Sequence, residues 1–105
     1  MEFNITEGKE TRVILTGKLD FAKSPVLMEE LSLLKGKDIS TILFECKELT
    51  YISSAGIRVL IYAQQKIAPG MCIVMENVCE DVMEILDMSG ISDFITFTES
   101  PHTGM

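Results

Sequence analysis

The chain has 105 residues, the size of a single domain, and close to half of them are apolar, as expected for a globular core. Its net charge of −7 disfavours nucleic acid as a direct partner, because the positive side chains are scattered singly and form no basic stripe. No apolar run approaches the roughly 20 residues of a membrane span, and no signal peptide is visible, so we expect a cytoplasmic protein that does not enter a membrane.

The first elements along the chain are a predicted hairpin and a helix. Residues 3–6 and 11–16 have the alternating or β-branched pattern of strands, and a Gly-containing turn separates them. Gly17 is expected to end the second strand. Ser24 and Pro25 have the order of an N-cap followed by a first helical residue, so they predict the start of a helix with one apolar face.

The remainder of the chain alternates strands with helices. Residues 40–44 and 71–75 are short apolar runs without alternation, which is typical of strands covered on both faces. Residues 45–50, in contrast, have the composition of a polar connection. A further helix is predicted over residues 80–88, where acids occupy the first turn, and residues 94–97 predict a last short strand.

Between the two apolar runs, a serine pair stands where a strand pattern gives way to a helical one. The stretch reads Tyr51-Ile52-Ser53-Ser54-Ala55-Gly56-Ile57-Arg58-Val59-Leu60. Either Ser53 or Ser54 is expected to open the helix, because a serine oxygen can accept hydrogen bonds from the unpaired N–H groups of a first turn. A helix end of this kind also favours an anion such as a phosphate, so the serine pair is a candidate cap and a candidate regulatory site.

The order of the predicted elements, β-β-α-β-α-β-α-β, indicates one α/β domain with helices against a mixed, mostly parallel sheet. We expect this domain to span residues 1–98 and a flexible tail to follow over residues 99–105. Loops at the carboxyl ends of strands gather functional groups in such sheets, and two of these loops carry Asp20 and the serine pair. We therefore expect Asp20 to lie near Ser53 and Ser54.

The sequence does not indicate a catalytic, metal or cofactor site. No Gly-rich phosphate loop is present, and the single histidine, His102, lies in the predicted tail, away from both serines. We therefore expect no enzyme activity, no cofactor and no metal. The cysteines lack metal-ligand spacing and are expected to be small buried apolar residues: Cys46, Cys72 and Cys79. Four methionines at core-periodic positions are expected to fill the core: Met71, Met75, Met83 and Met88.

Phosphorylation of Ser54 has a clear physical consequence. A phosphate adds nearly two negative charges and three acceptor oxygens, which the N-terminus of a helix tolerates. A protein interface built over this serine does not tolerate them, because the dianion must lose its water and is repelled by acidic neighbours. A loss of about 3 kcal/mol weakens binding roughly a hundredfold, so Ser54 is suited to an off-switch that leaves the fold unchanged.

Three segments resemble the STAS domain of bacterial anti-sigma factor antagonists. Residues 15–20 are similar to the family's L-x-G-x-L-D segment, which closes the second strand. Residues 51–60 are similar to its central motif, in which an aromatic and an apolar residue precede D/S–S–S/T/A–G. Residues 86–91 are similar to the segment that ends the third helix. The resemblance covers nearly the whole chain and implies the STAS fold.

The resemblance also implies a function. In the family's antagonists, the serine before the S/T/A–G pair is phosphorylated by the anti-sigma factor, which is a serine kinase that uses ATP, and a PP2C-type phosphatase reverses the reaction. The unphosphorylated form binds the kinase and frees the sigma factor. In this chain the matching acceptor is Ser54, and the candidate partner-binding residues around it are Asp20, Ser53, Ile57 and Arg58. The position before the acceptor is often Asp in the family and is Ser53 here, so Ser53 stays open as an alternative acceptor.

STAS domains also have other roles, which leaves an alternative function. The chain is then a constitutive STAS subunit of a multiprotein signalling or lipid-transport complex and is not phosphorylated. A third hypothesis, a small-molecule or nucleotide binder, depends only on the predicted helix N-terminus near Ser54.

Overall fold

The computed structural model describes residues 4–67 and 72–98 of the chain. Its elements are β1 Asn4–Thr6, β2 Glu10–Leu19, α1 Ser24–Ser32, β3 Thr41–Ile52, α2 Ser54–Tyr62, the π-helix η1 Ala63–Ile67, β4 Cys72–Glu76, α3 Glu80–Ser89, the 3₁₀ helix η2 Ile91–Phe94 and β5 Thr96–Thr98. The predicted order of strands and helices is confirmed. The predicted tail over residues 99–105 lies outside the described residues.

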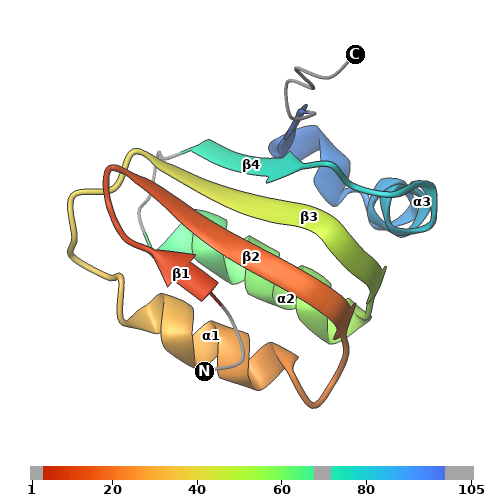
Figure 1. The fold of residues 1–105 in the computed structure, drawn as a ribbon, viewed down its shortest axis with the longest axis horizontal. Coiled ribbons are helices and arrows are strands. Elements are labelled where there is room, and N and C mark those ends of the chain that lie inside the picture. The colour runs from red at the N-terminus through yellow and green to blue at the C-terminus, as the bar shows by residue number, and fades with distance from the viewer. Residues whose placement is uncertain (1–3, 68–71, 99–105) are drawn as a thin grey trace.

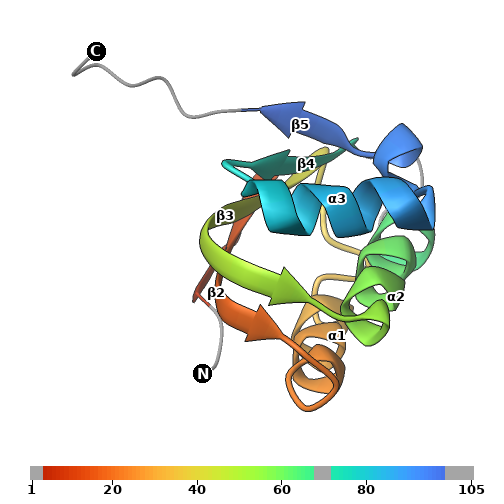
Figure 2. The same ribbon diagram turned by 90° about the vertical axis from the view of Figure 1, so that its right-hand side faces the viewer.

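The five strands form one sheet in the order β1-β2-β3-β4-β5. β1 pairs with β2 in an antiparallel manner and every later pair is parallel, so the predicted mixed, mostly parallel sheet is confirmed. Because successive parallel strands are neighbours, each helical crossover steps in the same direction across the sheet, and right-handed crossovers then put the helices on one face. α1 and α2 lie side by side under the sheet (Figure 1), and α3 lies beside β3 and β4 (Figure 2).

The core fills the space between this face of the sheet and the helices. Along β2, Val13 and Leu15 are buried, whereas Arg12 and Ile14, which point to the opposite face, are not. All three α-helices contribute to the same buried cluster, through Leu27, Leu31, Val59, Leu60, Val82 and Leu86. In the part of the chain that the structure describes, no helix is both long and apolar enough to cross a membrane.

Two strands continue through segments that were predicted to be loops. β2 does not end at Gly17 but bends there: Gly17 has a φ of 68°, and its pairing with β3 shifts between Gly17 and Lys18. β3 runs on through the predicted connection at residues 45–50. Its buried residues there are three apart rather than two, which hides the alternation of a strand: Cys46, Leu49 and Ile52. As a result, β2 and β3 extend together past the last residue that pairs with β4.

The face of the sheet opposite the helices carries an ion-pair cluster. Arg12 Nη1 lies 3.6 Å from Glu45 Oε1 and 3.7 Å from Glu76 Oε1. The side-chain amide of Asn77 donates to Glu45 Oε2 at 3.0 Å. Burial alone raises the pKa of Glu45, but hydrogen bonds with Asn77, Glu76 and the backbone N–H of Lys47, together with the Arg12 charge, hold that pKa below its ordinary value.

Several residues predicted to be buried are exposed. Met75 and Cys46 are fully buried as predicted and Met83 is half-buried, but Met88 is 81% exposed on α3, and Met71 lies outside the described residues. Cys72 and Cys79 are also exposed. Cys72 belongs to the face opposite the helices. Because the described helices cover only one face of the sheet, the prediction that β3 and β4 are covered on both faces is wrong.

Candidate functional site

The two serines at the start of α2 have different surroundings. Ser53 is the N-cap: its backbone is extended, and its Oγ accepts a hydrogen bond from the Gly56 N–H at 3.2 Å. Ser53 is only 3% exposed. Ser54 is the first helical residue and is exposed to solvent. Ser53 therefore satisfies the helix end, and the hydroxyl available to another protein belongs to Ser54.

Gly56 allows the first turn of α2 to approach the strand ends closely. A Cβ at this position would lie 2.7 Å from Ile52 Cγ1 and 3.0 Å from Leu19 Cδ2. These distances are too short for any side chain, so the glycine of the motif has a packing role. The close contact at Gly56 therefore determines how near the start of α2, and Ser54 with it, lies to the ends of β2 and β3.

Asp20 follows the end of β2, directly beside the start of α2. Leu19 pairs with Ile52, and the Ser53 N–H donates to the Leu19 carbonyl at 2.9 Å. Since Asp20 is the next residue after Leu19, the fold brings it to the serine pair, as the sequence predicts.

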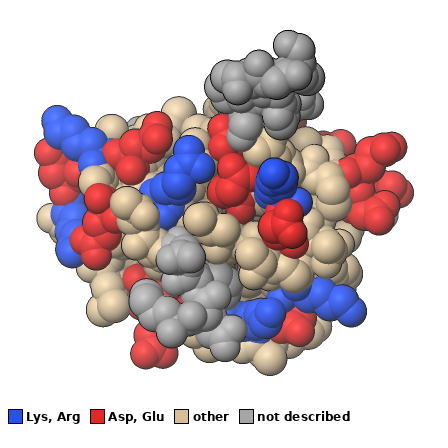
Figure 3. Space-filling model, viewed as in Figure 1, with Lys and Arg blue, Asp and Glu red and all other residues tan. Residues whose placement is uncertain are grey.

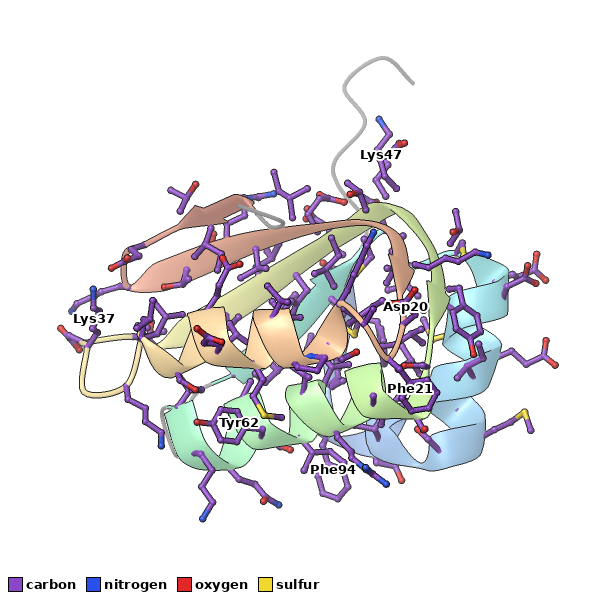
Figure 4. The ribbon with its side chains drawn as sticks, turned by 90° about the horizontal axis from the view of Figure 1, so that it is seen from below. Asp20, Phe21, Lys37, Lys47, Tyr62 and Phe94 are labelled. Carbon is purple, nitrogen blue, oxygen red and sulfur yellow. The ribbon has the colours of Figure 1, made fainter. Side chains whose placement is uncertain are left out.

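The side chain of Asp20 is engaged in its own loop. Its Oδ1 accepts from the backbone N–H groups of Ala22 at 3.1 Å and Lys23 at 3.0 Å, and the Ser24 hydroxyl donates to its carbonyl at 2.6 Å. Ser24 is thus the first residue of α1 and not its N-cap, because Asp20 turns the chain into the helix. Asp20 and Phe21 lie together on this loop (Figure 4).

Ile57 and Arg58 lie one turn after Ser54. Ile57 is half-buried and packs against the core, whereas Arg58 is exposed. Residues three or four apart share a helix face, so Ser54, Ile57 and Ile61 follow one another along one side of α2, with Arg58 next to them. A partner that covers Ser54 therefore meets apolar surface and a cation on the same helix.

Two exposed aromatic residues near this site were not selected from the sequence. Phe21 is 69% exposed on the loop after Asp20, and Tyr51 is half exposed near the end of β3. The sequence held one signal for Phe21, which directly follows Asp20 in a loop. A large apolar residue in a surface loop has no core to fill, so it is a candidate for contact with another molecule.

The Ser54 hydroxyl is exposed to solvent at the start of α2. The Asp20 carboxylate accepts from backbone N–H groups and not from a serine hydroxyl. Among residues 4–67 and 72–98, no group of three or more His, Cys, Asp or Glu side chains is arranged to hold a metal ion. The arrangement is suited to modification and to protein docking.

The sequence profile of the STAS domain matches residues 4–104. The chain belongs to the STAS domain family, and the resemblance seen in its motifs is confirmed. A relative in sequence, the anti-sigma-B factor antagonist of Bacillus subtilis (strain 168), is 26% identical over 99 residues, which cover 91% of this chain and 88% of the relative.

Solved structures share the fold at low sequence identity. An anti-sigma factor antagonist from Mycobacterium paratuberculosis has a TM-score of 0.80 at 11% identity, covering 97% of this chain and 86% of that one. The Bacillus cell fate determinant SpoIIAA in its phosphorylated form has a TM-score of 0.73 at 14% identity, covering 97% and 94%. The predicted STAS fold is therefore confirmed.

Proposed function

We propose that this chain is an anti-sigma factor antagonist that is switched off by phosphorylation of Ser54. The observation that carries the proposal is the exposed hydroxyl of Ser54, which stands at the first position of α2 directly after a buried cap. Two findings support it: the sequence relative is an anti-sigma-B factor antagonist, and a protein of the same fold is known in a phosphorylated form.

The proposed partner is an anti-sigma factor that is also a serine kinase. The unphosphorylated chain binds it through the face around Ser54 and thereby releases the sigma factor. Asp20, Ile57 and Arg58 contribute contacts, while Ser53, which is buried, contributes by holding the start of α2 in place.

The chain is the substrate in the proposed phosphorylation. The kinase transfers the γ-phosphoryl group of ATP to Ser54 Oγ, so that an O–P bond forms, the bond to ADP breaks and the hydroxyl proton is released. A PP2C-type phosphatase hydrolyses the same bond and restores the active form. In neither step does this chain supply a catalytic group or hold a cofactor, and neither step needs nucleic acid or a membrane.

Exposure favours Ser54 over Ser53 as the acceptor. A kinase must reach the hydroxyl, and the Ser53 hydroxyl is buried and already caps α2. Asp and Ser are about equally good N-caps, so the serine at position 53 keeps the capping role that the family's more common aspartate can fill.

The phosphate acts on the interface and spares the fold. At Ser54 it lies at the positive end of α2, and Arg58, one turn further along the helix, is placed to pair with it. The kinase, in contrast, must desolvate a dianion in order to bind the same face.

Mass spectrometry tests this proposal. The chain is incubated with ATP and with each serine kinase encoded beside its gene, and we expect one added phosphate that maps to Ser54 and is lost in Ser54→Ala. A kinase that binds the chain without phosphorylating it contradicts the switch and favours the constitutive subunit. Phosphate on Ser53 instead contradicts the site assignment but keeps the mechanism.

A further inference from the structure

A shallow apolar groove lies between α2 and the end of α3. Its volume is about 220 Å³, and its apolar walls are Ile61 of α2 and Ile91 and Phe94 of η2, with Gln64 and Gln65 of η1 beside them. Phe94 lies alongside α2 (Figure 4) and is 65% exposed. An aromatic ring this exposed adds little to the core and is available for contact with another molecule.

The net negative charge belongs entirely to the C-terminal third of the chain. Residues 1–67 contain nine acidic and nine basic residues, whereas residues 68–105 contain seven acidic residues and neither Lys nor Arg. Five of these acids are exposed on α3 and η2: Glu80, Asp81, Glu84, Asp87 and Asp93. Acidic side chains accordingly gather at the right-hand edge of the space-filling view (Figure 3), where Figure 1 places α3.

The groove and the acidic side chains adjoin. Asp93 directly precedes Phe94, and Asp87 lies two residues before Ser89, which lines the groove. Met88, between Asp87 and Ser89, is almost fully exposed. The nearby cations are on the other side of the groove: Lys66 follows Gln65, and Arg58 precedes Ile61 by about one turn of α2. This end of the molecule therefore combines exposed apolar side chains with an excess of negative charge.

We infer that the groove walled by Ile61, Ile91 and Phe94 is a docking site for a basic segment of a partner protein. The segment inserts one apolar side chain into the groove, and its Lys or Arg residues pair with Asp87 and Asp93. Charge complementarity selects this occupant, because the side of the groove formed by α3 and η2 carries Asp87 and Asp93 and neither Lys nor Arg, so a basic segment is attracted to it.

Other occupants fit the groove less well. Pockets for small-molecule ligands are typically roughly 300–1,000 Å³, whereas this groove has room for one or two side chains. A second copy of the chain is disfavoured, because a two-fold interface places the same acidic face against itself. The inferred site does not include Ser54 and does not depend on the proposed switch.

A random peptide library displayed on phage tests the inference with the intact chain as bait. We expect the enriched peptides to combine an aromatic or long aliphatic residue with several Lys or Arg. In fluorescence anisotropy with the best peptide, we expect Phe94→Ala to weaken binding about tenfold, and Asp87→Lys with Asp93→Lys to do the same. Binding is expected to weaken as salt rises.

Matched variants separate this site from the rest of the surface. Glu29→Lys with Glu48→Lys makes the same charge change on exposed residues outside α3 and η2 and is expected to leave peptide binding unchanged. The backbone amide signals of Gln64, Gln65 and Ile91 are expected to shift in NMR titrations of the unmodified chain, which gives a readout that needs no variant.

Four results would overturn the inference: no enriched peptide, enriched peptides without basic residues, equal binding to Phe94→Ala, or NMR shifts confined to other surfaces. Sedimentation equilibrium adds a fifth test. A dimer that Phe94→Ala abolishes would identify a second copy as the occupant and would contradict a basic partner.

Discussion

The Ser53 hydroxyl accepts a hydrogen bond from the Gly56 N–H at 3.2 Å, and these two residues together define the start of α2. Ser53 satisfies the helix end, and Gly56 brings the first turn against Leu19 and Ile52. Ser54 lies between a buried cap and a buried glycine, yet is itself exposed. Capping therefore belongs to Ser53, and the exposed hydroxyl that we propose as the phosphate acceptor belongs to Ser54.

Replacement of the cap tests this division. Ser53→Ala is expected to lower the free energy of unfolding by about 1 kcal/mol, because the Gly56 N–H loses its acceptor. The measurement is urea denaturation followed by circular dichroism. Ser54→Ala is the matched control and is expected to change stability by less than about 0.5 kcal/mol, since its side chain is exposed. A larger loss for Ser54→Ala than for Ser53→Ala would show that the roles are assigned the wrong way round.

The close approach at Gly56 gives a second prediction. Gly56→Ala is expected to destabilise the fold by about 1–3 kcal/mol, because the new Cβ overlaps Ile52 and Leu19 and the helix start must move. The control is Gly8→Ala, where a Cβ would meet its nearest atom at an ordinary 3.6 Å. Thermal unfolding of both variants checks the prediction, and equal melting temperatures would contradict the packing role of Gly56.

The order of strands and helices was predictable from the sequence, because helix periodicity and apolar runs report burial directly. The lengths of β2 and β3 were not. Gly17 has the composition of a strand end but occupies a bend within β2, and the three-residue spacing of Cys46, Leu49 and Ile52 conceals the continuation of β3.

The candidate site, like the strands, was only partly predictable from the sequence. The motif indicated a capped helix start. The separate roles of Ser53 and Ser54 depend on which serine contacts the strand ends, and only the tertiary fold reveals that contact. Met88 was predicted at a core-periodic position but is exposed, and Phe94 was predicted to begin the last strand but instead ends η2 and is exposed. Neither exposure was predictable, because an apolar residue in a regular element is normally buried.

The ion-pair cluster on the open face of the sheet predicts a pH dependence. The pKa of Glu45 is lower than its ordinary value of 4.5, so the carboxylate stabilises the folded state above that value and this stabilisation is lost as the pH falls through the lowered pKa. Glu45→Gln is therefore expected to be less stable than the unmodified chain at about pH 7, and the difference is expected to shrink toward about pH 3.

Denaturation at a series of pH values measures this difference. Arg12→Gln removes the cation that faces Glu45 and is expected to act in the same direction. A difference between Glu45→Gln and the unmodified chain that stays constant or grows as the pH falls would contradict the assignment of the stabilisation to the Glu45 carboxylate.

We propose that a phosphate on Ser54 prevents the kinase from binding the face around this serine. The most direct measurement is calorimetric titration of the cognate serine kinase with the unmodified chain, with Ser54→Ala and with the chain phosphorylated on Ser54. We expect the first two to bind with similar affinity and the phosphorylated chain to bind about a hundredfold more weakly. Equal affinities for the phosphorylated and unmodified chains would contradict the claim.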